Sequence, residues 1–162
     1  MTRRLTPVAA ALATVLLLSG CGLGADPEVD EDAVRAGLTT VDGVTDVTTG
    51  FASTGTPWSY GLTTEVAVDD AGLADLDHVL DVAIVVVAVG STGWSTYRFT
   101  VVTADASSPT GDRQVAIEDE LSPGDVPGTL LGGSLTLTPD QMRQAVADRP
   151  ARTIDRDPGR VS

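Results

Sequence analysis

The 162-residue chain lacks several residues that enzymes use for catalysis. It has no lysine, so a serine–lysine dyad is excluded, and its only histidine is His78. A zinc site needs several histidine or cysteine ligands, and the only cysteine is Cys21. With one cysteine the chain can form no internal disulfide, so its stability must come from packing. It also lacks the G-x-S-x-G pattern of a nucleophile elbow.

The single histidine lies at an ordinary position of a helical pattern, beside Leu76 and Leu80. This setting favours a half-buried or exposed helix residue over a catalytic base for His78. Paired carboxylates remain available, and a small cell-envelope hydrolase that uses them is the alternative function. We expect a non-catalytic domain with no cofactor and no metal site.

Basic residues are scarce, because ten arginines stand against 23 acidic residues and the net charge is −13. Nucleic-acid binding needs Lys and Arg against phosphate, so no nucleic-acid partner is expected. Carboxylates occur in short groups, but none has the alternating spacing of an EF-hand loop. We interpret them as solvated acidic faces, with weak surface binding of Ca²⁺ as the alternative. The groups are Asp30/Glu31/Asp32, Asp69/Asp70, Asp75/Asp77/Asp81 and Glu118/Asp119/Glu120.

The first 20 residues have the three parts of an export signal. Arg3 and Arg4 form a positive start, residues 8–18 are an apolar core, and the small residues Ser19 and Gly20 follow. An apolar core of 11 residues is too short to cross a hydrocarbon layer of about 30 Å as a helix.

The four residues Leu18-Ser19-Gly20-Cys21 resemble the lipobox of bacterial lipoproteins, of the small uncharacterised type found in high-G+C Gram-positive bacteria. The resemblance implies cleavage before Cys21 and a diacylglyceryl thioether on its sulfur. Two acyl chains anchor a protein stably, so the expected location is the outer face of the cytoplasmic membrane. An ordinary secreted protein with a free thiol at Cys21 is the alternative. The expected function is an extracytoplasmic domain for protein contact with an envelope partner or for weak ligand binding.

Composition divides the chain that follows. Residues 21–30 are short, acidic and glycine-containing and indicate a flexible tether, residues 31–138 a folded domain, and residues 139–149 a C-terminal helix. The last segment, 150–162, mixes Arg, Asp, Pro and Gly with few apolar residues and is expected to be disordered. The nine residues 22–30, if flexible, span about 15–18 Å, which keeps the domain close to the membrane.

Hydrophobic periodicity predicts the order α-β-β-α-β-β and then a last helix. The expected fold class is α+β, a two-layer α/β sandwich with an antiparallel-rich four-stranded sheet and an extra C-terminal helix. Thr138, Pro139 and Gln141 form a helix start with a capping box. The helix over 73–88 ends in a β-branched run, so a switch to strand over 82–89 is the alternative there. Strands are predicted over 44–54, 60–68, 94–104 and 114–118, with a candidate edge strand over 134–137 after a loop over 120–133.

All six aromatic residues lie between positions 51 and 99, and strand alternation buries Tyr60, Tyr97 and Phe99. Trp58 lies in a predicted turn, and Trp94 has the opposite parity to Tyr97. If both tryptophans are exposed, they form a contact patch for a partner protein or a glycan. Ordinary packing in the core is the alternative.

Two charged residues, Glu65 and Arg98, fall on the predicted wet faces of neighbouring strands. They are candidates for a cross-strand ion pair, which at a surface contributes little stability.

Overall fold

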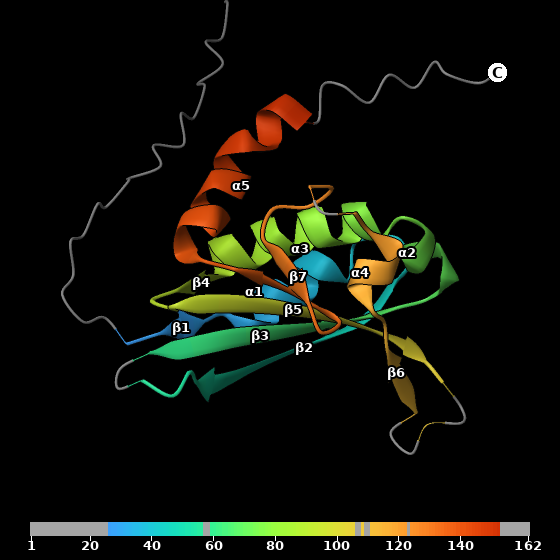
Figure 1. The fold of residues 1–162 in the computed structure, drawn as a ribbon, viewed down its shortest axis with the longest axis horizontal. Helices are drawn as coiled ribbons and strands as arrows, with labels where there is room; N and C mark the ends of the chain where they lie inside the picture. Colours follow the sequence, from blue (N-terminus) through green and yellow to red (C-terminus); the bar gives the residue numbers. More distant parts are fainter. Residues whose placement is uncertain (1–25, 57–58, 106–107, 109–110, 123, 153–162) are drawn as a thin grey trace, which may run out of the picture.

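The computed structural model describes residues 26–56, 59–105, 108, 111–122 and 124–152. These residues form a mixed α+β fold in which the helices lie on one face of a six-stranded sheet (Figure 1). The helices are α1 Glu31–Leu38, α2 Asp70–Ala74, α3 Leu76–Gly90, α4 Ile117–Glu120 and α5 Pro139–Arg152. The strands are β1 Glu28–Val29, β2 Val44–Ser53, β3 Tyr60–Val68, β4 Ser91–Thr92, β5 Thr96–Ala104, β6 Asp112–Gln114, β7 Thr129–Leu131 and β8 Ser134–Leu137.

The main sheet has the strand order β2-β3-β5-β8-β7, with β6 also paired to β5. The β2–β3 pair is an antiparallel hairpin, and α2 and α3 cross over to place β5 parallel to β3. The pairs β5–β8 and β7–β8 are antiparallel. The prediction of four strands is therefore wrong, because β8 is an interior strand and β7 forms inside the segment predicted as a loop.

The fourth predicted strand, over 114–118, is also misplaced. The strand β6 ends at Gln114, and the chain then forms the short helix α4. The physical reason is twofold: acidic residues are poor strand formers, and β8 occupies the part of β5 that a longer β6 would need. β8 pairs with residues 97–100 of β5, whereas β6 pairs with residues 102–104.

The long predicted helix over 73–88 is two helices. Asp75, at φ −121° and ψ 39°, separates α2 from α3. The β-branched end of α3 stays helical up to Gly90, because Ala83, Ile84 and Val87 are buried on its inner face. Tertiary packing overrides the strand tendency of this run.

The first helix begins at Glu31, where the side chain of the preceding Asp30 accepts a hydrogen bond from Ala33 N at 2.9 Å. It buries Val34 and Leu38 and ends at Leu38. The folded part also begins earlier than the predicted tether allows. Strand β1, which lies within residues 21–30, pairs with β4.

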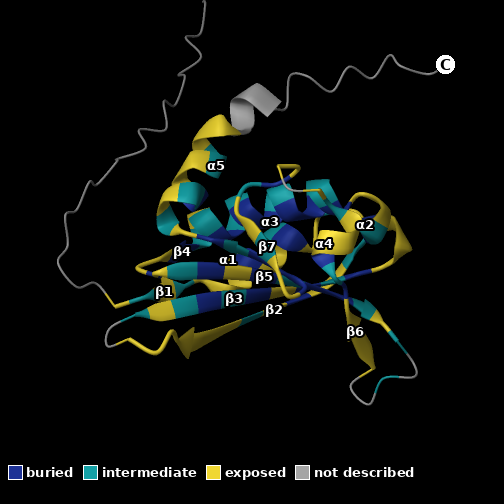
Figure 2. Cartoon of the chain, viewed as in Figure 1, coloured by how far each residue is buried: buried dark blue, intermediate teal, exposed yellow. Residues whose placement is uncertain are grey.

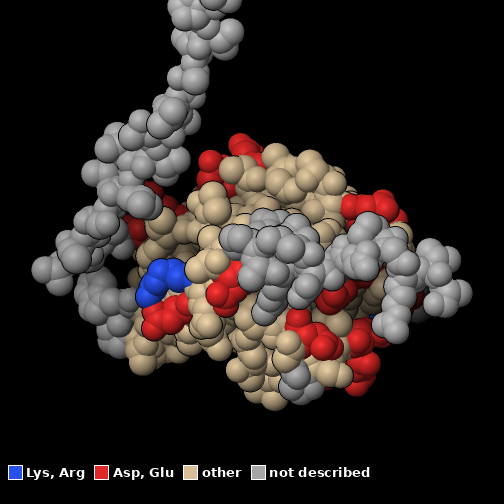
Figure 3. All heavy atoms as spheres, turned by 90° about the horizontal axis from the view of Figure 1, so that it is seen from above, with Lys and Arg blue, Asp and Glu red and all other residues tan. Residues whose placement is uncertain are grey.

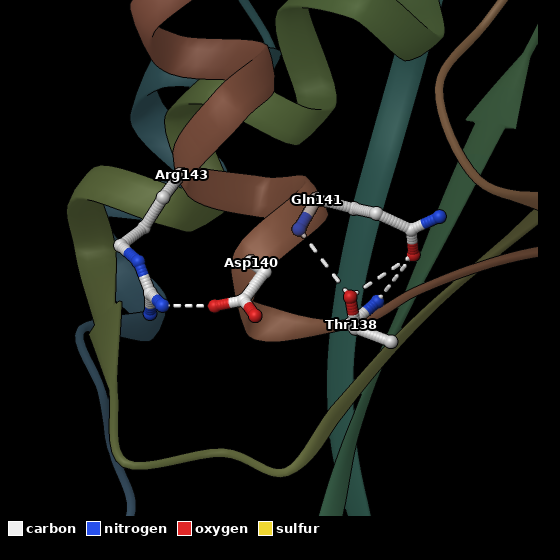
Figure 4. Close-up of polar contacts among 4 residues, drawn as sticks. All are labelled: Thr138, Asp140, Gln141 and Arg143. Atoms are coloured by element: carbon white, nitrogen blue, oxygen red, sulfur yellow. Dashed lines mark hydrogen bonds and ion pairs between the residues drawn. The ribbon is translucent and has the colours of Figure 1, made fainter.

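The start of α5 confirms the predicted capping box (Figure 4). Gln141 N donates to Thr138 Oγ1 at 3.3 Å, and Thr138 N donates to Gln141 Oε1 at 2.8 Å. Arg143 forms an ion pair with Asp140 in the same turn. The helix packs on α3 through the buried Met142 and runs to Arg152, past the predicted end. The rest of the predicted tail lies outside the described residues.

The core lies between the helices and the inner face of the sheet (Figure 2). Tyr97 and Phe99 are buried there, as predicted, but Tyr60 is 37% exposed. Tyr60 is the first residue of β3 and is paired with Ser53 at the end of the β2–β3 ladder, so alternation alone did not predict its exposure. The largest fully buried side chains are Phe99, Leu38, Leu62, Leu80, Ile84, Ile117, Leu135 and Leu137.

Candidate functional surfaces

The predicted lipidation site, Cys21, lies outside the described residues, five positions before Asp26, where the description begins. None of the helices within the described ranges has the length and apolar character to cross a membrane.

The chain enters the fold along the β4 turn. Trp94 Nε1 donates a hydrogen bond to the Glu28 carbonyl at 2.9 Å, and Asp30 N donates to the Gly90 carbonyl at 2.8 Å. Gly93 has φ +80°, and a Cβ there would lie 3.0 Å from the Cα of Pro27. Only glycine lets the incoming chain pass so close to this turn in that conformation. Residues 27–30 are therefore fixed against the body of the domain.

This arrangement determines how far Trp94, one of the two tryptophans of the candidate contact patch, is exposed. Trp94 is only 5% exposed, because its indole lies under the incoming chain and its ring centroid is 6.0 Å from that of Phe51. Trp94 therefore follows the alternative of ordinary packing, and Trp58 lies outside the described residues. The parity argument failed because β5 begins at Thr96, so Trp94 precedes the strand and its alternation. The exposed aromatic residue beside it is Phe51, at 71%.

None of the described helices lies on the outer face of the sheet (Figure 1). Its residues, which we call the open sheet face, are the outward-facing ones of β2, β3, β5, β8 and β7. Threonine is the commonest type, and few residues on this face are charged. One register row across the sheet contains Thr48, Glu65, Thr100, Ser134 and Leu131, and the next contains Gly50, Thr63, Arg98, Thr136 and Thr129.

Glu65 and Arg98 both lie on the open sheet face, as predicted, and both are exposed. Glu65 is opposite Thr100 and Arg98 is opposite Thr63, so the two side chains are diagonal neighbours. The ion pairs among the described residues, Arg35–Asp46 and Arg143–Asp140, do not include them. The predicted cross-strand pair is therefore not formed.

Strand β2 is an edge of the main sheet and pairs with β3 alone. Its register shifts between Val44 and Asp46, which leaves Thr45 as a bulge. Arg35 of α1 lies over this end, with Nη1 3.4 Å from Asp46 Oδ1. Bulges and charges of this kind discourage pairing with another chain at one end of an edge strand. The remaining residues, 48–53, are mostly exposed.

Acidic residues gather instead on the helices α1–α5, which we call the helix layer. Figure 3 looks down on this layer and shows carboxylates at several places, with few cationic side chains. Two of its arginines, Arg35 and Arg143, are paired with carboxylates. The acidic residues are Glu31, Asp32, Asp70, Asp77, Asp81, Glu118, Asp119, Glu120, Asp140 and Asp148.

Two open depressions contain carboxylates, and in each a carboxylate caps a helix. The first is lined by Thr45, residues 68–71 and residues 103–104, and Asp69 Oδ1 there accepts bonds from Ala71 N and Gly72 N at 2.9 and 3.1 Å. The second is lined by residues 27–30, Ala33 and residues 89–92, and its Asp30 caps α1. In both depressions, therefore, the capping carboxylate satisfies backbone N–H groups at a helix start.

The remaining candidates for chemistry are His78 and the groups of carboxylates. His78 lies half-buried on α3, as predicted for a helix residue. In the part of the chain that is described, no three His, Cys, Asp or Glu side chains are grouped as metal ligands.

No protein-family model matches the chain, and comparisons with curated proteins and with solved structures find no match either.

Proposed function

We propose that the protein is a lipid-anchored extracytoplasmic domain that acts by binding at the membrane surface. The observation that carries the proposal is the lipobox-like Leu18-Ser19-Gly20-Cys21, which precedes the first strand of the fold, Glu28–Val29, by only a few residues. A diacylglyceryl group on Cys21 would hold the domain stably on the bilayer, because two acyl chains suffice for anchoring.

The experiment is the substitution Cys21→Ser in the producing cells. The expected result is loss of the protein from the membrane fraction, with release into the medium or retention as uncleaved precursor. Leu131→Ser, at a side chain that is 76% exposed on the folded domain, is the control and is expected to leave the membrane fraction unchanged. Unchanged detergent partitioning of the Cys21→Ser protein would contradict the anchor.

The open sheet face is the surface that we propose for contact with an envelope protein. Charged residues are depleted from the centres of protein interfaces, and this face has far fewer of them than the helix layer. Thr63 and Arg98 are paired residues near its middle, on the neighbouring strands β3 and β5. A partner docking here would meet little of the negative charge that the helices carry.

A photo-cross-linking residue tests this contact when it replaces Thr63 in cells that carry the anchored protein. The matched position is Asp32, an exposed residue of α1 in the helix layer. We expect a cross-linked product from position 63, weakened by Arg98→Glu, and none from position 32. Equal cross-linking at both positions would contradict a contact through the open sheet face.

A further inference from the structure

Exposed large apolar side chains are few among the described residues, and three of the four lie around the entry of the chain into the fold. They are Phe51, Tyr60 and Val89, at 71%, 37% and 76% exposure, and we call them the entry corner. The fourth, Leu131, lies on β7, which belongs to the other edge of the sheet from β2. Scattered exposed apolar residues are normal, but a group at one point of a surface suggests a contact.

Two residues of the entry corner are linked to the entering chain through Trp94 and Ser95. The ring of Phe51 contacts that of Trp94, whose indole donates to Glu28. The Tyr60 carbonyl accepts bonds from Ser95 N and Oγ, one residue after Trp94.

The third residue, Val89, is joined to the same place from the helix side. It precedes Gly90, whose carbonyl accepts the bond from Asp30 N. It also lines the open depression beside β1, together with Pro27 and Ala33. The entry corner thus surrounds the entering residues 27–30, with Phe51 and Tyr60 on the sheet side and Val89 on the helix side.

The distance to the proposed anchor is short. Cys21 lies five positions before Asp26, and even a fully extended chain of this length reaches only about 18 Å. Because residues 27–30 are fixed against β4, the corner cannot swing away from that tether as an independent segment. An anchor in the bilayer therefore holds this corner nearest to the lipid headgroups.

We propose that the entry corner is a membrane-contact surface, on which Phe51, Tyr60 and Val89 lie against the lipid bilayer that holds Cys21. This inference rests on the proposed lipid anchor. Tyrosine and other aromatic side chains suit the interface between headgroups and acyl chains. A weak apolar contact suffices, because the tether makes it intramolecular and raises its effective concentration.

Charge favours lipid over a second copy of the chain as the occupant. Glu28 and Asp30 flank the corner, and a second copy docked on the same corner would bring its own carboxylates against them. Zwitterionic lipid does not carry this net negative charge. Anionic lipid does, so we expect it to weaken the contact at low salt, with recovery as salt screens the charges beyond about 8 Å.

The test uses the lipid-modified protein in phosphatidylcholine vesicles, with mass spectrometry of the N-terminal residue as a check on the anchor. Because Cys21 is then blocked, Val89→Cys and Leu131→Cys each give one free thiol for a nitroxide label. The measurement compares collision of each label with lipid-soluble oxygen and with a water-soluble nickel chelate. Both positions are 76% exposed, so they form a matched pair.

We expect an oxygen-to-nickel ratio several-fold higher at position 89 than at position 131. The ratio at position 89 should fall when Phe51→Ser is added and remain high when Leu131→Ser is added. It should also fall in the Cys21→Ser protein mixed with the same vesicles.

Other results would overturn the inference in distinguishable ways. Equal ratios at both positions, with lipid found on Cys21, would reject the membrane contact and leave the anchor intact. Shielding of position 89 from both reagents that grows with protein concentration would assign the corner to a second copy. An N-terminal residue without lipid would reject the proposed function and this inference together.

Discussion

The helix layer and the open sheet face are both exposed to solvent, yet they differ in the number of charged residues and in the hydrogen bonds that those residues form. Carboxylates of the helix side include caps, such as Asp30 and Asp69, that hold the starts of α1 and α2. On the open sheet face the two diagonal charges, Glu65 and Arg98, have no ion pair with each other. Two carboxylates of the helix side thus have a structural role as caps, whereas the open sheet face has few charged residues.

The largest expected change in stability distinguishes the inner face of strand β5 from its outer face. Phe99 on the inner face of β5 is fully buried, and Phe99→Ala should cost about 3–5 kcal/mol of unfolding free energy through lost burial and a cavity. Arg98→Ala, one residue earlier on the open face, should change it by no more than about 0.5 kcal/mol. Urea denaturation measures both, and similar losses would show that the outer face also contributes packing.

The junction between the helix layer and the sheet edge should be nearly as sensitive. Gly43 has φ +79°, and a Cβ there would lie 2.0 Å from Gly72 N at the start of α2. Gly43→Ala should therefore cost about 2–5 kcal/mol, from the left-handed backbone and from overpacking. Thermal or urea unfolding measures the loss.

Gly55 provides the matched control, because it has φ +88° in the β2–β3 turn with nothing within 4 Å of its Cβ position. Gly55→Ala should cost about 1–2 kcal/mol, from the backbone conformation alone. Equal losses of unfolding free energy at the two glycines would mean that the backbone around Gly43 and Gly72 can move apart at no cost to admit the new methyl group.

Local signals in the sequence predicted the elements that depend on few partners. Alternation over 60–68 placed Leu62, Val66 and Val68 on the buried face of β3, and the residues after Leu137 specified the start of α5. In both cases neighbours within the same element determine the structure.

The features that the sequence did not predict depend on distant partners. β8 is interior because β6 uses only residues 102–104 of β5 and leaves 97–100 to be paired. Trp94 is buried because Glu28, 66 positions earlier, brings its carbonyl to the indole. Phe51 was grouped with the other aromatic residues, but it is 71% exposed on β2, an edge strand of the main sheet.

A smaller effect should distinguish a capping carboxylate from a purely surface one. Asp69 accepts two backbone bonds at the start of α2, and Asp69→Ala should cost about 1 kcal/mol. Asp42 is an exposed loop residue, so Asp42→Ala should lower the unfolding free energy by no more than about 0.5 kcal/mol. If both changes were neutral in urea denaturation, the acidic residues of the helix side would be surface charge alone.

The smallest effect concerns α5, the helix whose far half extends from the body of the domain (Figure 1). Gln141 accepts bonds from Thr138 N and Oγ1, so Gln141→Ala removes half of the capping box and should cost about 0.5–1 kcal/mol. Gln144→Ala, at an exposed position in the same helix, removes no capping bond and should be neutral or slightly stabilising, because alanine is the better helix former. Hydrogen exchange of the α5 amides is the suitable measurement, since a helix end can open without global unfolding. Faster exchange in the Gln141 variant alone would show that capping, in addition to Met142 packing, holds this helix on the layer, and equal exchange in both variants would assign that role to packing.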